Sequence, residues 1–504
     1  MFRHITGGDY RHPQSSPGNS IIGEVGPRLL SETMINETEP VEKIESILLK
    51  KTGICWFSLM LNLLFVFHVP LAAQDSHYWT NHYGTEAQLL GGLVIGNVSD
   101  LSSTYYNPGS MALSSDERLV ISTDAVEFIN ISIEERASKE IESLYTRPTP
   151  GIFALRFWSD SLQINHLAFS YLVRRNFIFE FESVFSDTRE INQNWPGPEL
   201  YFGEFYAFNR LSESWGGITW SRTFSDNVGF GITQYVAVKS HQFREQAIAQ
   251  ATGESNAAAS ATYIKRWKYY HVRLLWKMGF VISGDRLSAG ITVTTPSIGL
   301  FGSASAFGNI SRIISDTEPL LLSGIREDLD VSYRSPFSIA IGIAYRIARS
   351  RIYISAEYFD HIIPFTVIDG GTTSAAPQTD NLELKFQHNL RQVFNIGLGL
   401  QHELTEDVAL YTSFSTNNSG FNPDQPSDMT RSPYDIYQLT LGSSFAIYNF
   451  KLTLGVGLGF GSGNLQGLVS PVAGGQSDGL LEQNQESKIH YTSLKLLLGV
   501  SAAL

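Results

Sequence analysis

Seven charged side chains lie within runs of alternating residues, where the position of each constrains its surroundings. In most of these runs, bulky apolar residues occupy one parity, and the charge shares the other parity with small or polar residues. A basic side chain facing lipid at mid-membrane costs about 2–4 kcal/mol, and an acidic one less. In a membrane barrel these charges would therefore face the lumen, where they would meet a ligand carboxylate or an internal segment. The seven are Lys239, Arg273, Lys277, Arg346, Glu357, Lys451 and Lys495, with Arg273, Arg346 and Glu357 the foremost candidates.

No motif for catalysis or cofactor binding is present. G-x-S-x-G, Walker A, HExxH and CxxC sequences are all missing. Glycines recur at every second position from Gly455 to Gly463, which fails G-x-G-x-x-G and indicates the small face of one strand. Five histidines are too scattered to predict a metal site or a Ser–His hydrolase: His166, His241, His271, His388 and His402. We therefore expect no enzymatic activity, no cofactor and no metal.

The composition favours a membrane barrel. Of 504 residues, 12% are aromatic, 43 are glycine and only 17% are charged, which suits a wall between lipid and a packed or wet lumen. The net charge is −13, and without a basic patch we expect no nucleic-acid partner. Acidic residues gather in expected loops, either simply solvated or bridged by divalent cations to lipopolysaccharide. The single cysteine, Cys55, excludes an intrachain disulfide.

Residues 50–73 have the order of a secretory signal peptide. Lys50 and Lys51 precede the apolar run 53–67, and Ala72-Ala73 provides a cleavage site before Gln74. The run is short for a spanning helix, which needs about 20 apolar residues, although an uncleaved anchor is the alternative. Residues 1–49 form an N-terminal extension with no periodicity, so translation is expected to start at Met34 or the extension is spurious.

Beyond residue 117 the apolar residues recur with a period of two, which indicates strands. The odd positions of 339–347 carry Ile or Tyr, and the even positions 340–346 carry Ala, Gly or Arg. Such strands fit a soluble sandwich with an apolar interior, or a barrel with an apolar exterior. Short turns, such as Gly284-Asp285, alternate with long polar connections, such as 243–264, 300–328 and 362–381. This alternation is typical of an outer-membrane barrel with short periplasmic turns.

The expected barrel spans 118–504 and has an even number of strands, fourteen, which places both of its ends on the periplasmic side. The fold class is therefore all-β, a transmembrane antiparallel β-barrel. The expected strands are 118–133, 150–158, 162–186, 200–224, 226–242, 265–283, 286–298, 329–348, 350–361, 382–404, 407–417, 434–448, 450–462 and 487–503.

Residues 74–117 do not alternate, and they carry a distinctive set of small and turn-forming residues. Gly91-Gly92 is followed by Asp100 and then by Asn107-Pro108-Gly109. Pro fixes φ and lacks a donor, Asn tolerates left-handed geometry, and Gly permits a tight reversal. With these features the chain resembles the FadL-like family of outer-membrane transporters for long-chain fatty acids and hydrocarbons. Thr295-Pro296-Ser297, which closes a strand, is also similar to the family.

The resemblance implies a fourteen-stranded barrel whose N-terminal hatch, residues 74–117, folds inside the lumen. It also implies passive uptake of a hydrophobic small molecule, such as a long-chain fatty acid, into a Gram-negative cell. The expected partners are this ligand, outer-membrane lipid and lipopolysaccharide, and the barrel-assembly machinery during biogenesis. The sequence departs from the family at Gly109-Ser110-Met111, in an extra aromatic stretch at 77–83, and in ending at Leu504 rather than an aromatic residue.

Two other functions fit the same sequence pattern. A porin-like channel for polar solutes would have an open, hydrated lumen without a hatch. A structural or secretion-associated barrel would stay closed and bind a protein partner through its loops. An ordinary turn before the first strand is likewise the alternative to a hatch anchor at Asn107-Pro108-Gly109.

We predict that the processed protein begins near Gln74, because the order of charged, apolar and small residues over 50–73 directs secretion and cleavage. N-terminal sequencing of protein from the outer-membrane fraction checks this expectation. Recovery of a chain that still starts at Met1 would contradict it.

Overall fold

The structure is a computed structural model. It describes residues 76–114, 118–134, 141–190, 195, 197–254, 257–315, 317–374, 381–425, 427–429, 432–465, 469–471, 480–483 and 487–503. The expected extension 1–49 and signal peptide 50–73 lie outside the described residues. Among the residues it describes, no helix has the length and hydropathy of a membrane-spanning helix.

Strands dominate the described chain, and its short helices all precede the first strand. The helices are α2 (Glu86–Leu89), α3 (Ser103–Tyr106) and the 3-10 helix η1 (Pro108–Ala112). The strands are β1 (Leu119–Glu134), β2 (Ile141–Ser159), β3 (Asn165–Arg189), β4 (Glu199–Ser225), β5 (Val228–Thr252), β6 (Ala258–Ser283), β7 (Leu287–Thr294), β8 (Ile298–Ile314), β9 (Leu320–Leu329), β10 (Ser338–Ile347), β11 (Ser350–Phe359), β12 (Ile362–Ser374), β13 (Asn381–Leu390), β14 (Val393–Glu403), β15 (Val408–Asn417), β16 (Asp435–Ile447), β17 (Phe450–Leu465), β18 (Val469–Pro471), β19 (Leu481–Gln483) and β20 (Ser487–Ala502).

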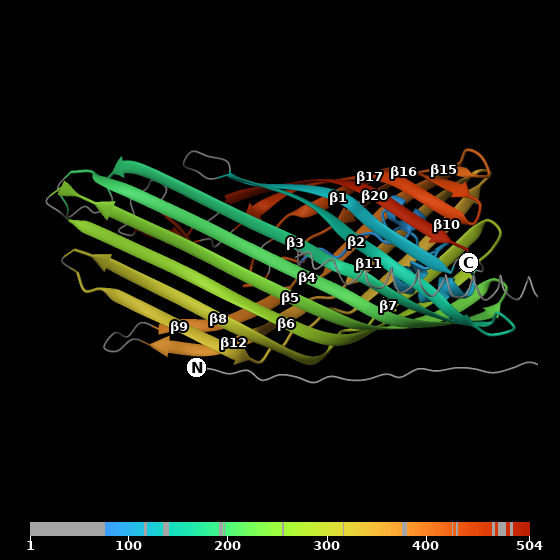
Figure 1. Cartoon of the computed structure of the whole chain (residues 1–504), viewed down its shortest axis with the longest axis horizontal. Coiled ribbons are helices and arrows are strands. Elements are labelled where there is room, and N and C mark those ends of the chain that lie inside the picture. The colour runs from blue at the N-terminus through green and yellow to red at the C-terminus, as the bar shows by residue number, and fades with distance from the viewer. Residues whose placement is uncertain are drawn as a thin grey trace, which may run out of the picture. The chain divides into compact units, whose positions relative to one another are not determined.

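Fourteen strands form a closed antiparallel ring. Around the ring they run β5, β4, β3, β2, β1, β20, β17, β16, β15, β14, β11, β10, β7 and β6, and β6 pairs with β5 to close it. The first and last strands pair over their length, with Leu119 opposite Ala502. The sheet therefore has no free edge at membrane level along this seam. The predicted fourteen-stranded antiparallel barrel is confirmed (Figure 1).

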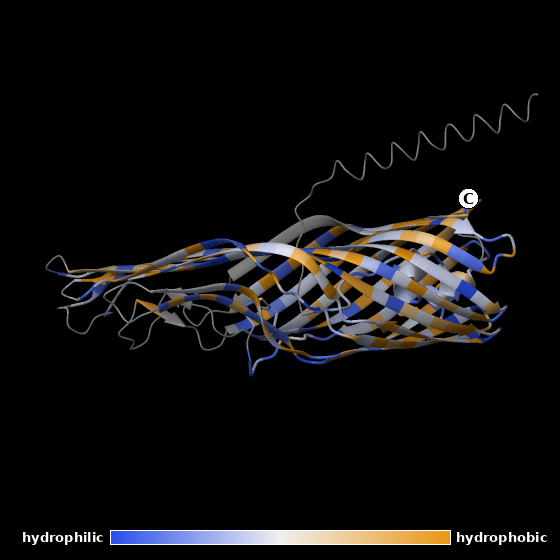
Figure 2. Ribbon diagram, turned by 90° about the horizontal axis from the view of Figure 1, so that it is seen from below, coloured by the Kyte–Doolittle hydropathy of each residue, from blue (hydrophilic) through white to orange (hydrophobic). Residues whose placement is uncertain are grey.

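The bulky apolar side chains at alternate positions of the wall strands point outward. On β10, Ile341 is 57% exposed while its neighbour Ala340 is 2% exposed, and Leu398 on β14 is 54% exposed. Figure 2 shows the resulting alternation of hydrophobic and hydrophilic residues along the strands. Apolar side chains that face away from the protein interior are stable in lipid and costly in water. This orientation decides between the barrel and the soluble sandwich that the sequence left open.

Strands β3 to β6 run far past the part of the wall needed to cross a membrane. They have 25, 27, 25 and 26 residues, whereas about 10 suffice for crossing. In Figure 1 they extend from the end that holds the C-terminus to the opposite end of the view. The predicted polar loops at 243–264 and 300–328 are therefore wrong in part, because both consist largely of paired strand. Alanines occupy the inward-facing positions of these strands, as at Ala249 and Ala261, and this hides the alternation of apolar and polar residues.

Four neighbouring wall strands are interrupted at one level. Pairing aligns Thr294 with Ser338, Ser338 with Phe359, and Phe359 with Val393. Directly beyond this row, β7 breaks before β8, β9 before β10, β11 before β12, and β13 before β14. The strand predicted at 329–348 thus begins only at Ser338, the strand predicted at 382–404 is divided between β13 and β14, and the predicted loop at 362–381 begins with β12. Pro296 and Pro336 lie within two of the breaks and cannot donate to a ladder.

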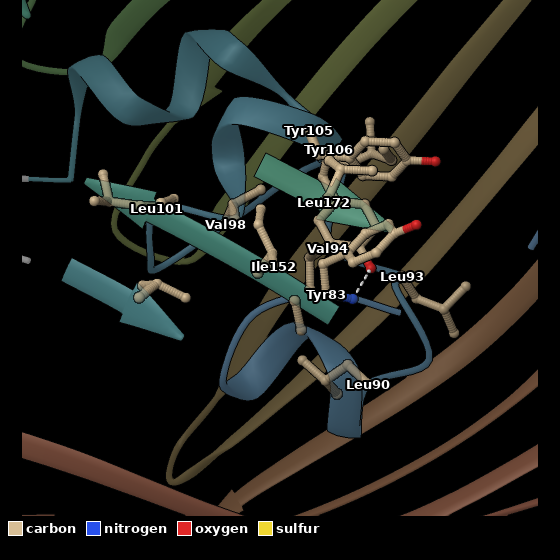
Figure 3. Close-up of a cluster of buried hydrophobic side chains, with 14 of the residues drawn as sticks. Tyr83, Leu90, Leu93, Val94, Val98, Leu101, Tyr105, Tyr106, Ile152 and Leu172 are labelled. Carbon is tan, nitrogen blue, oxygen red and sulfur yellow. Dashed lines mark hydrogen bonds between the residues drawn. The ribbon is translucent and has the colours of Figure 1, made fainter. Parts of the chain in front are cut away.

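Residues 76–114, which we call the luminal segment, fill the barrel interior. Its residues Tyr83, Leu89 and Leu93 are fully buried and share one apolar cluster with Ile152 and Leu172 of the wall. Figure 3 shows Tyr83, Tyr105 and Tyr106 grouped in this cluster, with the Tyr83 backbone N–H donating to the Tyr106 hydroxyl at 2.9 Å. The predicted fold, a barrel with an N-terminal segment inside its lumen, is confirmed.

We predict that a protease added to intact cells cuts only at the tips of the long strands. The ladders of β5, β6 and β8 protect their backbones, so cleavage is expected in the connections at 253–257 and 315–319. The short turn at Gly284-Asp285 lies at the opposite end and should remain intact. Mass spectrometry of the released peptides measures this, and cleavage at Gly284-Asp285 in sealed cells would invert the topology.

Candidate functional site

Asp100 organises the first half of the luminal segment. Its carboxylate accepts hydrogen bonds from the backbone N–H of Thr85 at 2.6 Å and the Thr85 hydroxyl at 2.7 Å. It also accepts one from the backbone N–H of Ser102 at 2.8 Å. Gly84, beside it, has φ +89, and a Cβ there would lie 2.8 Å from the Asp100 carboxylate. The acidic residue singled out in the sequence thus joins two turns of the segment.

Asn107 joins the luminal segment to the wall. Its side-chain amide donates to the carbonyl of Ile95 at 2.9 Å and to that of Phe280 in β6 at 3.1 Å. Its amide oxygen accepts from the backbone N–H of Gly109 at 3.1 Å, which caps η1, with Pro108 as the first helical residue. Asn107 has an extended backbone, with φ −151, and makes no use of the left-handed geometry that Asn tolerates. An extended N-cap followed by Pro is a helix start rather than a tight reversal.

Glycines on the wall allow the backbone of the luminal segment to touch the strands directly. A Cβ on Gly109 would lie 2.7 Å from the carbonyl oxygen of Gly279 and 2.8 Å from that of Gly229. A Cβ on Gly231 would collide with the carbonyl of Pro108. Such distances leave no room for any side chain. The glycines on the inward-facing side of β5 and β6 therefore make space for Pro108-Gly109. The segment is therefore seated against the wall.

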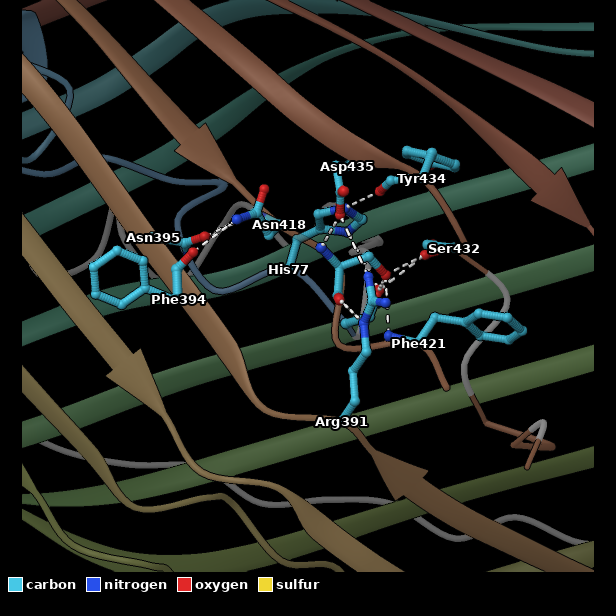
Figure 4. Close-up of polar contacts among 11 residues, drawn as sticks. His77, Arg391, Phe394, Asn395, Asn418, Phe421, Ser432, Tyr434 and Asp435 are labelled. Carbon is cyan, nitrogen blue, oxygen red and sulfur yellow. Dashed lines mark hydrogen bonds and ion pairs between the residues drawn. The ribbon is translucent and has the colours of Figure 1, made fainter. Parts of the chain in front are cut away.

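Both ends of the luminal segment are tied down. At its start, buried His77 donates from Nε2 to the Tyr434 carbonyl at 2.7 Å, and burial lowers the pKa of His77 to about 3. Figure 4 shows this contact beside the ion pair of Arg391 with Asp435. At its end, Arg156 of β2 donates to the carbonyl of Ser114 at 2.5 Å. The segment thus runs from the long-strand side of the lumen to the short-turn side.

Several lumen-facing charges hold the luminal segment. Glu357 accepts a hydrogen bond from the Trp79 indole at 2.7 Å and from the Ser338 hydroxyl at 2.8 Å. Lys451 forms an ion pair with Glu86 at 2.7 Å. A further contact runs from Lys495, which donates to the Thr80 carbonyl at 2.8 Å and pairs with Asp124 at 3.2 Å and Glu127 at 3.3 Å.

The three foremost candidate residues do not lie together. Arg273 is fully buried and pairs with Glu213 at 2.7 Å, with its guanidinium 4.7 Å from the centre of the Tyr333 ring. Arg273 and Glu357 therefore border the same region of the lumen. Arg346 lies beside the short turn that follows β10, is 43% exposed, and pairs with Glu403 at 3.0 Å. The structure places it away from both.

A cavity lies above the luminal segment, between it and the long strands. It is open to solvent on one side. Aromatic rings and cationic side chains share its lining. The lining residues are Tyr78, Tyr105, Arg174, Arg175, Glu213, Trp215, Leu275, Lys277, Thr294, Tyr333, Ser335, Pro336, Ser338, Glu357 and Phe359.

Arg174 is the most informative residue in this cavity. Its Nη2 donates to the Tyr78 carbonyl at 2.6 Å, while its buried Nη1 has no hydrogen-bond partner among the described residues. Its guanidinium also lies 5.7 Å from the ring centres of Tyr105 and Trp215. Sequence analysis missed Arg174 because a bulge between Val173 and Arg175 breaks the alternation. The one available signal was the adjacent pair Arg174-Arg175 within an apolar strand.

No group of His, Asp or Glu side chains within the described ranges is arranged to hold a metal ion. Four of the five histidines weighed in the sequence, His166, His241, His388 and His402, have ordinary polar contacts instead, such as the Ser159 hydroxyl with His166 at 2.8 Å. The site that remains is the aromatic and cationic cavity, closed on its short-turn side by the luminal segment.

By sequence, neither a protein-family model nor a curated protein matches this chain. Solved structures do match. The toluene transporter TodX of Pseudomonas putida aligns with a TM-score of 0.53 and 12% identity, over 84% of this chain and 99% of TodX. The toluene transporter TbuX of Ralstonia pickettii gives 0.53 and 10%, over 84% and 99%. A FadL homologue of Pseudomonas aeruginosa gives 0.50 and 11%, over 86% and 100%.

The chain has the FadL-type barrel fold. This likeness confirms the resemblance predicted from Asp100 and Asn107-Pro108-Gly109 at the level of the fold. At these low identities it carries no residue-by-residue correspondence, so the roles of residues in this FadL-type barrel rest on its own contacts.

We predict that Gly231→Val unseats the luminal segment, because the added side chain must displace the backbone of Pro108. Overpacking of this kind costs about 1–3 kcal/mol. The unfolding temperature of the purified barrel should fall, and its conductance in planar bilayers should rise. Gly216→Val is the matched control, since a Cβ on Gly216 meets nothing within 4 Å. Equal behaviour of the two variants would contradict close seating.

Proposed function

We propose that this barrel lies in the outer membrane of a Gram-negative cell and takes up hydrophobic small molecules passively. Its fold is that of proteins described as toluene transporters and as a monoaromatic hydrocarbon channel. The apolar exterior supports a place in a bilayer, and outer-membrane lipid and lipopolysaccharide are the proposed surroundings of the wall. Assembly by the barrel-assembly machinery belongs to the same proposal.

The cavity favours a ligand with an apolar body and an anionic head, such as a long-chain fatty acid. Aromatic rings of Tyr105, Trp215 and Phe359 offer apolar contact area. Arg174, Arg175 and Lys277 outnumber the lining carboxylates Glu213 and Glu357, and Glu213 is already paired with Arg273. The single observation that carries the proposal is the buried Nη1 of Arg174, a charged donor with no described partner. A ligand carboxylate would supply the acceptor.

A sideways route through the wall suits such a ligand. Strand β2 pairs with β3 only between Ile152 and Ser159, and above Leu172 the two strands part in the described chain. At this level the carbonyl of Val173 accepts from Tyr83 at 2.9 Å and from Asn81 at 3.2 Å, both in the luminal segment. The segment therefore both blocks the path to the short-turn side and borders this opening, so a ligand could leave toward lipid without crossing it.

A polar porin fits these contacts less well. The lumen is filled by residues 76–114, and the inward charges Lys451, Lys495 and Glu357 are engaged in ion pairs or hydrogen bonds. Uptake of an amphipathic ligand makes use of the cavity, whereas a porin would need the lumen cleared. Planar-bilayer recording distinguishes them, because the intact protein should be nearly silent.

We predict that Arg174→Gln weakens binding of oleate about 10- to 100-fold, as expected for loss of a charge-assisted hydrogen bond of about 1.5–3 kcal/mol. Binding of methyl oleate, which has no carboxylate, should change little. Isothermal titration of the detergent-solubilised barrel measures both affinities.

Arg266→Gln on β6 is the control for that experiment, since Arg266 is exposed and lies 5.1 Å over the ring of Phe307. It should bind both ligands as the unmodified protein does. Equal affinity of the unmodified protein for oleate and methyl oleate would contradict the proposal that the cavity recognises an anionic head. Failure to bind either, together with open-channel conductance, would favour the porin.

A further inference from the structure

The wall has a second interruption beside β6. It is separate from the seam between β1 and β20 and from the place where β2 and β3 part. Above Thr294, β10 no longer pairs with the rising strand, and β9 pairs with β8 only from Ala304 outward. Between these ladders, residues 298–303 of β8 keep β6 on one side and have no strand pairing on the other within the described chain. We call this gap the β8 window.

The segment between β9 and β10, which would cover the window, pairs with a different strand. Between β9 and β10, Val331 bridges to Ile368 of β12, and the Ser332 backbone N–H donates to the Val367 carbonyl at 3.1 Å. Val331 and Ser332 thus pair with β12 instead of β8. Across the window, the Ser335 backbone N–H donates to the Ser297 hydroxyl at 2.9 Å, and Arg273 of β6 donates to the Ser335 hydroxyl at 2.5 Å.

The outer border of the window is apolar on consecutive residues. Ile298 is 56% exposed, Leu300 50% and Phe301 60%. A register shift between Val272 and Arg273 of β6 makes Leu300 an extra residue, so that side chains of both parities are exposed. The last residue of β7, Thr294, lies about 20 Å above the short turns at a rise of about 3.3 Å per residue and a tilt of about 40°. The border therefore faces the upper part of the lipid-facing band.

The inner border of the window is the ligand cavity itself. Thr294, Tyr333, Ser335 and Pro336 line that cavity and flank the gap. On the far side of the same cavity stand Arg174 and Arg175, next to the parting of β2 and β3. The cavity thus reaches the wall at two places, and each is marked by a bulge, one in β3 and one where β8 pairs with β6.

We propose that the β8 window is a second side opening, through which the hydrophobic ligand of the cavity exchanges with the lipid bilayer. The proposal rests on the proposed uptake function and adds a separate passage at Ser297 and Ser335. The apolar border of Ile298, Leu300 and Phe301 would keep an acyl chain out of water along this passage. Two hydrogen bonds cross it, from the Ser335 backbone to Ser297 and from Arg273 to the Ser335 hydroxyl, so opening it breaks fewer hydrogen bonds than parting a full ladder.

A disulfide across the window tests the passage. In Ser297→Cys/Ser335→Cys the two cysteines flank the gap, and the only native cysteine, Cys55, lies in the predicted signal peptide. The variant is reconstituted in phosphatidylethanolamine–phosphatidylglycerol vesicles with the fluorescent fatty acid cis-parinaric acid as probe. Stopped-flow fluorescence then gives the probe's affinity and its rate of transfer from the barrel to the bilayer, before and after oxidation.

Oxidation should slow transfer by about an order of magnitude, as when an access gate is fixed shut, and reduction should restore it. Ala289→Cys/Ile343→Cys, on directly opposed residues of the paired β7–β10 ladder, is the control and should leave the rate unchanged. Equal transfer rates in the oxidised and reduced window variant, with probe binding intact, would overturn the second opening alone. Absence of probe binding in the unmodified barrel would instead overturn the proposed function on which it rests.

Discussion

The close contact between the backbone of the luminal segment and the glycine-rich wall is the constraint on which the rest of the structure depends. Gly229, Gly231 and Gly279 let Pro108-Gly109 rest directly on β5 and β6, where any side chain would force them apart. Because the segment is held this low, its own side chains and the inward charges meet at fixed distances. The space left above it becomes the cavity. A wall with larger inner residues would have no place for the segment.

Charge is distributed between support of this segment and the lining of the cavity. Glu357 and Lys451 reach residues of the segment, and Arg273 is neutralised by Glu213. Arg174 belongs to the segment's support through one nitrogen and to the cavity through the other. The charges that contact the luminal segment are engaged, whereas the ladder hydrogen bonds of the wall are interrupted at the strand breaks around the cavity.

The sequence predicted the wall well because lipid imposes a strict period on it. Runs such as 339–347 alternate without exception, and fourteen strands were placed from them together with the short turns. Above the membrane, lipid no longer imposes this period. Strands that carry alanine at every second position, as at Ala249, are therefore predicted as loops. The divided strands at Pro296 and Pro336 depend on which partner each backbone finds, a non-local choice. Asp100 and Asn107 were recognisable by type, whereas Arg174 was hidden by a bulge that shifts the register.

Pairing of Leu119 with Ala502 has a consequence for how the molecule is made. The ring closes between its first and last strands, so closure waits until the whole chain has been delivered, and contacts so distant in sequence form slowly. Residues 76–114 are synthesised first, yet their partners on β5, β6 and β17 arrive later, and a closed ring would exclude them. The interior must therefore be occupied before the final seam forms. The contacts of the luminal segment with β5, β6 and β17 therefore join residues that lie far apart in the order of synthesis.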